Sequence, residues 1–143
     1  MENAITRLYL VRHCQSMGNL QNIFQGQHEY DVSPVGEQQL ALLSLRFRNI
    51  HLDAIYSSPL QRAAKTAEAI NAYHNLPITP LDDLMEIDVG ELEAKPLSDL
   101  PVQYPVLSRH WNETPQDGVF PGGESMRQVF DRASAALRTI LAE

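Results

Sequence analysis

Two Ser-Pro pairs, each at the start of a helical pattern, do most to limit the folds open to this chain. In Ser33-Pro34 and in Ser58-Pro59 the serine suits a helix N-cap, and the proline suits the first helical position, where its missing N–H is not needed. The segments before these helices are apolar and rich in strand-forming residues: ITRLYLV (5–11) and LDAIYS (52–57). This alternation of strands and helices predicts an α/β fold.

The apolar residues after each pair recur at helical spacing. Gln61 stands three residues after Ser58 and completes the pattern of a capping box. A further helix is expected near Ser125, with an apolar face that needs a sheet to cover it. The three faces comprise Leu40, Leu43 and Phe47; Leu60, Ala63, Ala64, Ala67 and Ile70; and Met126, Val129, Phe130, Ala133, Leu137 and Ile140.

Composition excludes several classes of protein. A chain of 143 residues, 43% of them hydrophobic, fits one domain with a substantial core. The net charge of -7 argues against nucleic acid or an anionic membrane as a partner. No apolar run is long enough to span a bilayer, and the single cysteine suits a reducing compartment, so we expect a soluble cytoplasmic protein. The sequence does not indicate an oligomeric state.

Basic side chains follow both strand candidates. Arg12 and His13 come directly after residues 5–11, and Arg62 lies in the first turn of the helix after residues 52–57. Taken alone, the Arg-His pair is typical of a strand end, and Arg62 is typical of a solvated surface arginine. Ligands of parallel α/β sheets, however, collect at the carboxyl ends of the strands, where these residues would converge. Two arginines and a histidine suit a phosphoryl group, with the imidazole as nucleophile.

Other phosphate chemistries lack their residues in this sequence. There is no G-x-x-x-x-G-K-[ST] loop, and Leu20 stands where a cysteine phosphatase built on Cys14 would need an arginine. Cys14 is therefore interpreted as a small packed residue. The spacing of the histidines indicates no metal site. A second pair, Arg109-His110, is interpreted as part of an irregular packed segment.

Several motifs, in one order along the chain, resemble those of the histidine phosphatase superfamily, which includes the cofactor-dependent phosphoglycerate mutases. LVRHCQSMGN is similar to the family's R-H-G-E-[ST]-x-x-N signature, and FQGQHEYDVSPVGEQQ resembles its substrate loop. SSPLQRAAKTAEAI, LMEIDVGELEAKP and PGGES resemble the three later motifs. The resemblance implies a three-layer α/β sandwich with a mostly parallel central sheet flanked by helices.

The resemblance also implies roles for individual residues. His13 corresponds to the phosphoryl-accepting histidine, Arg12 and Arg62 to the arginines that hold the phosphoryl oxygens, and Glu86 to the proton donor. Without the family, Glu86 could not be chosen over its acidic neighbours Asp88, Glu91 and Glu93. Asn19, Gln25 and Gly26 correspond to substrate-binding positions. The implied enzyme is a metal-independent phosphomonoester hydrolase that uses no cofactor and acts on a small phosphorylated metabolite.

The chain departs from the family pattern in two respects. Cys14 and Gln15 replace the usual glycine and acid after the histidine. The family's second active-site histidine, carried on a later strand, has no counterpart before Glu143, so we expect a single domain that is truncated at its C-terminus. A phosphoglycerate-type mutase and a non-catalytic module that binds a phosphorylated ligand remain as alternatives.

Overall fold

The computed structural model describes residues 5–142, in which helices dominate. None of the helices in this range is both long enough and apolar enough to cross a membrane. The α-helices are α1 (Met17–Leu20), α2 (Pro34–Phe47), α3 (Gln61–Asn71), α4 (Leu100–Gln103), α5 (Pro105–Glu113) and α6 (Met126–Ala142). The strands are β1 (Ile55–Ser57) and β2 (Ile78–Pro80), and the 3-10 helices are η1 (Asp82–Leu84), η2 (Gly90–Leu92), η3 (Leu97–Asp99) and η4 (Pro115–Asp117).

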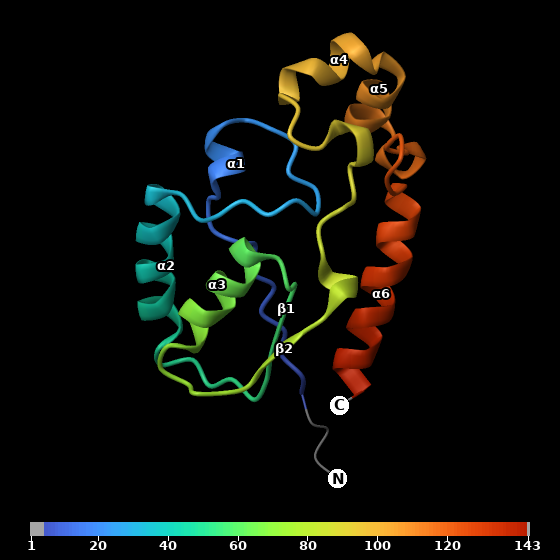
Figure 1. Ribbon diagram of the computed structural model, residues 1–143. Coiled ribbons are helices and arrows are strands. Elements are labelled where there is room, and N and C mark those ends of the chain that lie inside the picture. The colour runs from blue at the N-terminus through green and yellow to red at the C-terminus, as the bar shows by residue number, and fades with distance from the viewer. Residues whose placement is uncertain (1–4, 143) are drawn as a thin grey trace.

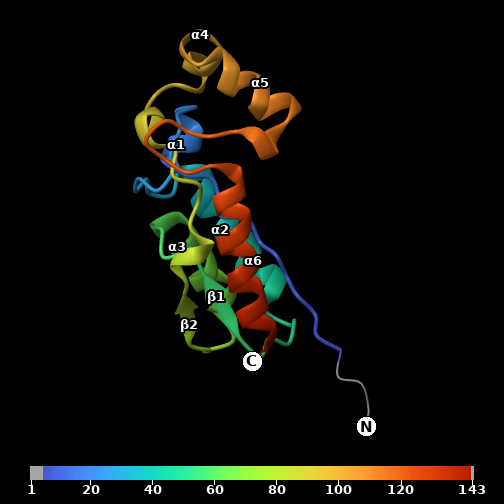
Figure 2. The same ribbon diagram turned by 90° about the vertical axis from the view of Figure 1, so that its right-hand side faces the viewer.

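Helices lie on both sides of a small parallel sheet. Strands β1 and β2 pair in parallel, with Ile55 opposite Ile78 and Ser57 opposite Pro80. Helix α3 packs on these strands and α2 packs on α3, whereas α6 lies on the other side and contacts η1 (Figures 1 and 2). This arrangement confirms the predicted α/β sandwich.

The two predicted helix starts have different outcomes. Ser33 is the N-cap of α2, and its Oγ accepts a hydrogen bond from Gly36 N at 3.0 Å, as predicted. The prediction of a capping box at Ser58 was wrong. Helix α3 begins after Leu60, and this N-cap residue provides no side-chain cap. The Glu29 carboxylate, from a loop far away in sequence, instead accepts a hydrogen bond from Gln61 N at 2.9 Å. A tertiary contact thus replaces the local cap.

The prediction of a strand over residues 5–11 was also wrong for the described chain. A strand needs a neighbouring backbone to satisfy its N–H and C=O groups, and no residue within 5–142 pairs with this segment. Its apolar side chains are therefore open to solvent, Ile5 at 92% and Leu10 at 88%. The second predicted strand is present but shorter, because pairing with β2 begins only at Ile55.

Two hydrophobic clusters form the core. The first joins the segment around Phe24 to η2, α4 and α5, and the second lies where α2, β1 and α3 meet. Met126 and Val129 of α6 pack on the first cluster, but Phe130 and Leu137 stay 65% and 37% exposed, so the predicted apolar face is only partly covered. The clusters comprise Phe24, Ile87, Val89, Leu92, Leu100, Leu107 and Phe120; and Phe47, Ile55, Ala67 and Ile70.

The segment around Arg109 and His110 is regular, which corrects the prediction of an irregular one. Both residues lie in α5, which begins at Pro105 and buries Leu107. Proline at the first position is compatible with a helix, so it starts α5 rather than breaking it. His110 Nδ1 lies 2.8 Å from Thr114 Oγ1 at the end of the same helix.

Candidate active site

The ring of His13 is oriented by the residue that follows it. His13 Nδ1 lies 2.6 Å from the Cys14 carbonyl oxygen. A carbonyl can only accept, so Nδ1 carries a hydrogen and Nε2 is the nitrogen that loses its proton in the neutral ring. Partial burial lowers the pKa of His13, and the nearby charges of Arg62 and Arg12 lower it further, against the opposing effects of Cys14 and Glu86. The ring therefore presents Nε2 as a nucleophile near neutral pH.

Helix α3 holds the backbone next to His13. Cys14 N donates to Thr66 Oγ1 at 3.0 Å, and the Thr66 hydroxyl donates to the Arg62 carbonyl at 2.7 Å. Cys14 is buried and unpaired, which agrees with its interpretation as a small packed residue. One turn of α3 thus fixes the histidine segment and also carries Arg62. Arg62 and the histidine segment are thus brought together by α3, although residues 5–11 form no strand within the described chain.

Arg62 is a buried cation. Its side chain is 1% exposed, with Nη2 donating to the Gly26 carbonyl at 2.8 Å and Nη1 to the His28 carbonyl at 3.1 Å. Burial lowers the pKa of Arg62, and the charges of Glu86, Glu29 and Glu93 oppose that effect. Within the described chain, Arg62 forms no ion pair with a carboxylate. An anionic ligand would compensate this guanidinium.

The loop that Arg62 contacts is held on its other side by Glu93. One carboxylate oxygen, Glu93 Oε1, accepts hydrogen bonds from Gln27 N and His28 N, each at 2.9 Å. Gly26 has a φ of 49°, and a Cβ there would lie 2.7 Å from the same oxygen. Only glycine permits this close approach.

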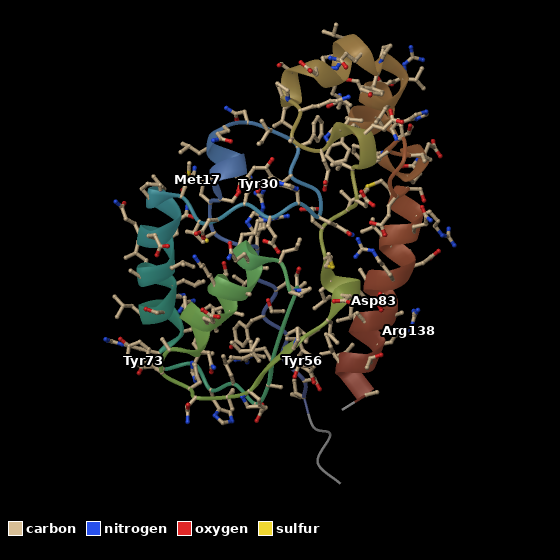
Figure 3. All side chains as sticks on the ribbon, viewed as in Figure 1. Met17, Tyr30, Tyr56, Tyr73, Asp83 and Arg138 are labelled. Carbon is tan, nitrogen blue, oxygen red and sulfur yellow. The ribbon has the colours of Figure 1, made fainter. Side chains whose placement is uncertain are left out.

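Asn19 and Gln25 meet at the buried side chain of Ser16. Asn19 Oδ1 accepts from Ser16 N at 3.0 Å, which forms a capping box at the start of α1. The Ser16 hydroxyl lies within hydrogen-bond distance of both Asn19 Oδ1 and Gln25 Oε1. Figure 3 shows Met17 of α1 beside the loop at Tyr30, and Met17 N donates to Asp31 O at 2.8 Å. The two amides therefore belong to one network that joins α1 to the loop.

Glu86 is the member of the acidic run whose charge affects His13. Its carboxylate is exposed, and its negative charge raises the pKa of both His13 and Arg62. Asp88 Oδ1 instead accepts from Gly90 N at 2.8 Å within a turn, and Glu93 holds the loop. Arg12 is exposed, and its charge lowers the pKa of His13, which places it near the ring.

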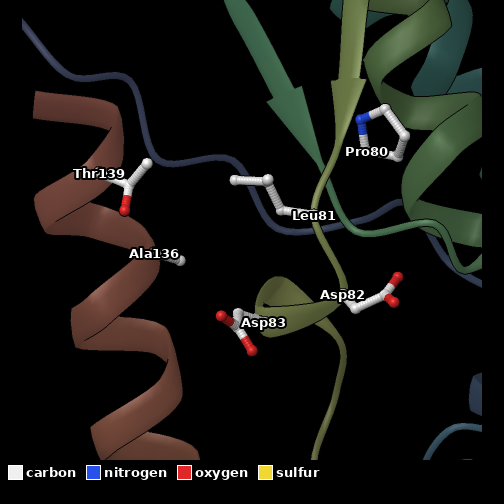
Figure 4. A pocket seen from close by; sticks show the side chains of 6 residues that line it. All are labelled: Pro80, Leu81, Asp82, Asp83, Ala136 and Thr139. Atoms are coloured by element: carbon white, nitrogen blue, oxygen red, sulfur yellow. The ribbon is translucent and has the colours of Figure 1, made fainter. Parts of the chain in front are cut away.

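Two cavities are lined by other parts of the chain. One, of about 300 Å³, lies between α6 and the end of β2 (Figure 4), and the second, of about 480 Å³, lies beside α5. His13, Arg62 and Glu86 line neither of them. Within residues 5–142, no three His, Cys, Asp or Glu side chains gather as metal ligands would.

Comparison with known proteins places the chain in a family. The sequence model of the Histidine phosphatase superfamily (branch 1) matches residues 8–143. The chain belongs to this superfamily. It is 36% identical to phosphoserine phosphatase 1 of Hydrogenobacter thermophilus over 95% of this chain and 64% of that protein. It is 36% identical to the probable phosphoglycerate mutase GpmB of Salmonella choleraesuis over 94% of this chain and 63% of that protein.

A solved structure shows the same fold. Bacillus stearothermophilus YhfR superimposes with a TM-score of 0.85 at 28% identity, over 92% of this chain and 65% of that one. The chain thus spans less than two thirds of the length of these curated relatives and of YhfR. The described part of the superfamily fold contains all of the predicted site residues.

Four residues that organise the site were not singled out from the sequence. Thr66, Glu93 and Glu124 each lie within a quoted motif, so the motifs contained the signal. Arg132 lies in none of them. Its side chain donates hydrogen bonds to three backbone carbonyls. Because every residue has a carbonyl, the residue types at those positions give no sign of the contact.

The protonation of His13 is open to direct measurement. We expect its titration midpoint, followed by NMR of the ring nitrogens in the folded protein, to lie below the ordinary value of about 6.5. The folded state then binds fewer protons than the unfolded state between the two values, so stability should fall as the pH falls from about 6.5 through the folded-state pKa. His13→Gln should remove this fall, and the exposed control His51→Gln should retain it. A midpoint above 6.5 would contradict the burial argument.

Proposed function

We propose that this chain is the larger part of a phosphomonoester hydrolase that acts through phosphohistidine on a small phosphorylated metabolite. The observation that carries the proposal is His13, with Nδ1 bonded to Cys14 O and a pKa lowered chiefly by burial, on the same scaffold as the buried Arg62. The relatives named as phosphoserine phosphatase and probable phosphoglycerate mutase support a small phosphorylated substrate. The buried free Cys14 fits a reducing compartment, and we infer a cytoplasmic location.

The reaction divides into two transfers. In the first, His13 Nε2 attacks phosphorus and the bond to the leaving oxygen breaks, while protonated Glu86 gives that oxygen its proton. In the second, the Glu86 carboxylate takes a proton from water as the water oxygen attacks phosphorus and the bond to Nε2 breaks. Arg12 and Arg62 stabilise the charge on the phosphoryl oxygens throughout. The amide oxygens of Asn19 and Gln25 are engaged at Ser16, and we infer that their NH₂ groups serve as donors to the phosphoryl group.

The phosphoryl adduct tests the nucleophile. We expect a base-stable, acid-labile adduct on His13 during turnover of p-nitrophenyl phosphate by the full-length gene product, detected by intact-protein mass spectrometry after an alkaline quench. His13→Ala should abolish the adduct, because it removes the attacking nitrogen. His110→Ala should leave it intact. An adduct that survives His13→Ala would exclude the assignment.

The leaving group tests Glu86. Glu86→Gln should slow the release of a poor leaving group by about 100-fold or more, because general acids contribute on this scale. The phosphorylation step with p-nitrophenyl phosphate should slow much less, because p-nitrophenolate leaves without a proton. Burst kinetics with phenyl phosphate and p-nitrophenyl phosphate separate these effects. Equal slowing of both bursts would show that Glu86 acts only in positioning or in the second transfer.

The fate of the phosphoryl adduct on His13 distinguishes a hydrolase from the two alternative functions. A phosphoglycerate-type mutase would pass the phosphoryl group from His13 to an added hydroxy acid rather than to water. A non-catalytic module would bind inorganic phosphate and form no adduct. Transfer to water is the outcome expected here.

We further propose that strands following residue 143 complete a single domain and bring a second active-site histidine. Support comes from the exposed apolar residues of 5–11, from the exposed Phe130 and Leu137 on α6, and from the greater length of the relatives. Such strands would pair with residues 5–11 and cover the apolar layer.

Expression of residues 1–143 beside the full-length gene product tests this completion. The short chain should aggregate or be inactive, because an unpaired strand edge and an exposed apolar face both favour association. The full-length protein should be monodisperse by size-exclusion chromatography and active. A short chain that melts cooperatively and hydrolyses p-nitrophenyl phosphate as well as the full-length protein would refute the proposal.

A further inference from the structure

One guanidinium on α6 holds the backbone of the segment that leads to Glu86. Arg132 Nη1 donates to the Asp83 carbonyl at 2.9 Å and to the Met85 carbonyl at 2.7 Å, and Nη2 donates to the Glu86 carbonyl at 3.1 Å. Figures 3 and 4 show Asp83 beside α6. A planar fork with several donors can satisfy several acceptors in one fixed geometry, which a lysine cannot do.

Glu124, from the PGGES motif, fixes the Arg132 side chain. The pair is bidentate, with Arg132 Nε 2.8 Å from Glu124 Oε1 and Nη2 2.9 Å from Oε2. The two side chains are only 16% and 20% exposed. This hydrogen-bonded pairing lowers the pKa of Glu124 and raises that of Arg132, so both stay charged. Such charge-assisted, two-pronged contacts are strong and directional.

The same carboxylate also reaches past Glu86 to the other side of the segment. Glu124 Oε2 accepts from Asp88 N at 2.9 Å, and Glu124 N donates to the Asp88 carbonyl at 2.8 Å. The backbone is therefore held before Glu86 by Arg132 and after it by Glu124. Gln27 Nε2 adds a third contact, to the Glu86 carbonyl at 3.2 Å.

Glu86 needs this support because no regular element contains it. It lies between η1 and η2, and the only hydrogen bond that the structure gives its carboxylate is from Ile87 N at 3.0 Å. An exposed carboxylate on an irregular segment keeps a fixed distance to His13 only if its backbone is fixed. Contacts from α6 supply that constraint.

We propose that Arg132 is a positioning residue for Glu86, and that Glu124 orients Arg132 for this task. The proposal rests on the proposed function, in which Glu86 transfers protons to the leaving oxygen and from water. It gives the PGGES motif a role in proton transfer, exerted through the backbone and without contact with the substrate.

The test compares two substrates of similar shape in the full-length gene product. Phenyl phosphate needs a proton on its leaving oxygen, whereas p-nitrophenyl phosphate does not. We expect Arg132→Lys to lower kcat/KM for phenyl phosphate by about tenfold or more, because misplacement of a reacting group by about 1 Å has effects of this size or larger. The loss for p-nitrophenyl phosphate should be much smaller. Glu124→Gln should also lower kcat/KM for phenyl phosphate relative to that for p-nitrophenyl phosphate, but by a smaller factor than Arg132→Lys.

Arg127→Met is the matched control. Arg127 lies on the same helix, is 77% exposed, and pairs only with Asp131 at 3.2 Å. The Arg127→Met variant should leave kcat/KM unchanged for both phenyl phosphate and p-nitrophenyl phosphate. In a Glu86→Gln background, Arg132→Lys should produce no further change in the ratio of the two substrates, because the group that it positions is already absent.

If Arg132 had a purely structural role, Arg132→Lys would lower kcat/KM equally for both substrates, or would change the ratio of the two kcat/KM values again in the Glu86→Gln background. Either result would overturn the proposal. If Arg132→Lys does not fold, Glu124→Gln, which preserves the shape of the side chain, carries the same comparison. Hydrogen exchange gives a readout independent of activity: amides at 84–88 should exchange faster in Arg132→Lys than in Arg127→Met. A wild-type protein that hydrolyses neither substrate would refute the proposed function, while unchanged exchange would refute the positioning role separately.

Discussion

The buried charge of Arg62 is the constraint around which the site is arranged. A guanidinium that is 1% exposed must be compensated, and the chain compensates it in two ways. The carbonyls of Gly26 and His28 accept its hydrogen bonds, and the carboxylates of Glu86, Glu29 and Glu93 provide negative charge without forming an ion pair with it. The cation is thereby retained inside the protein without a direct carboxylate partner in the described chain.

This arrangement links Glu29 with acidic residues that the sequence presents as one undifferentiated run between Glu86 and Glu93. Glu93 reinforces the loop that accepts from Arg62, Glu29 takes the first N–H of α3, and Asp88 closes a turn. Glu86 alone among the members of the run acts on the charge of His13. Neighbouring carboxylates therefore have different tasks, set by which backbone or side-chain donor lies nearest to each.

The sequence predicted those parts of the molecule that depend on local pattern or on general topology. Ser33 capped α2 as expected, and Arg62 acts on the charge of His13 as expected, although hydrogen bonds from α3 rather than a pair of strand ends bring the two segments together. Prediction failed where a distant partner decides the local structure. Glu29 displaced the expected cap at Ser58, and residues 5–11 lack a neighbouring strand within the described chain. Arg132 was not predicted because three of its contacts are with backbone carbonyl oxygens, which every residue possesses, and its side-chain partner Glu124 lies eight residues away.

The hydrogen bond between Cys14 N and Thr66 Oγ1 joins positions 52 residues apart in sequence. Closing a loop of this length is entropically costly, so such a contact forms late compared with a local helix or turn. The orientation of the His13 ring depends on the Cys14 peptide, and that peptide is fixed only after α3 has docked. A chain in which α3 has not docked consequently carries an ordinary histidine at position 13, because the hydrogen bond that fixes the Cys14 peptide is absent.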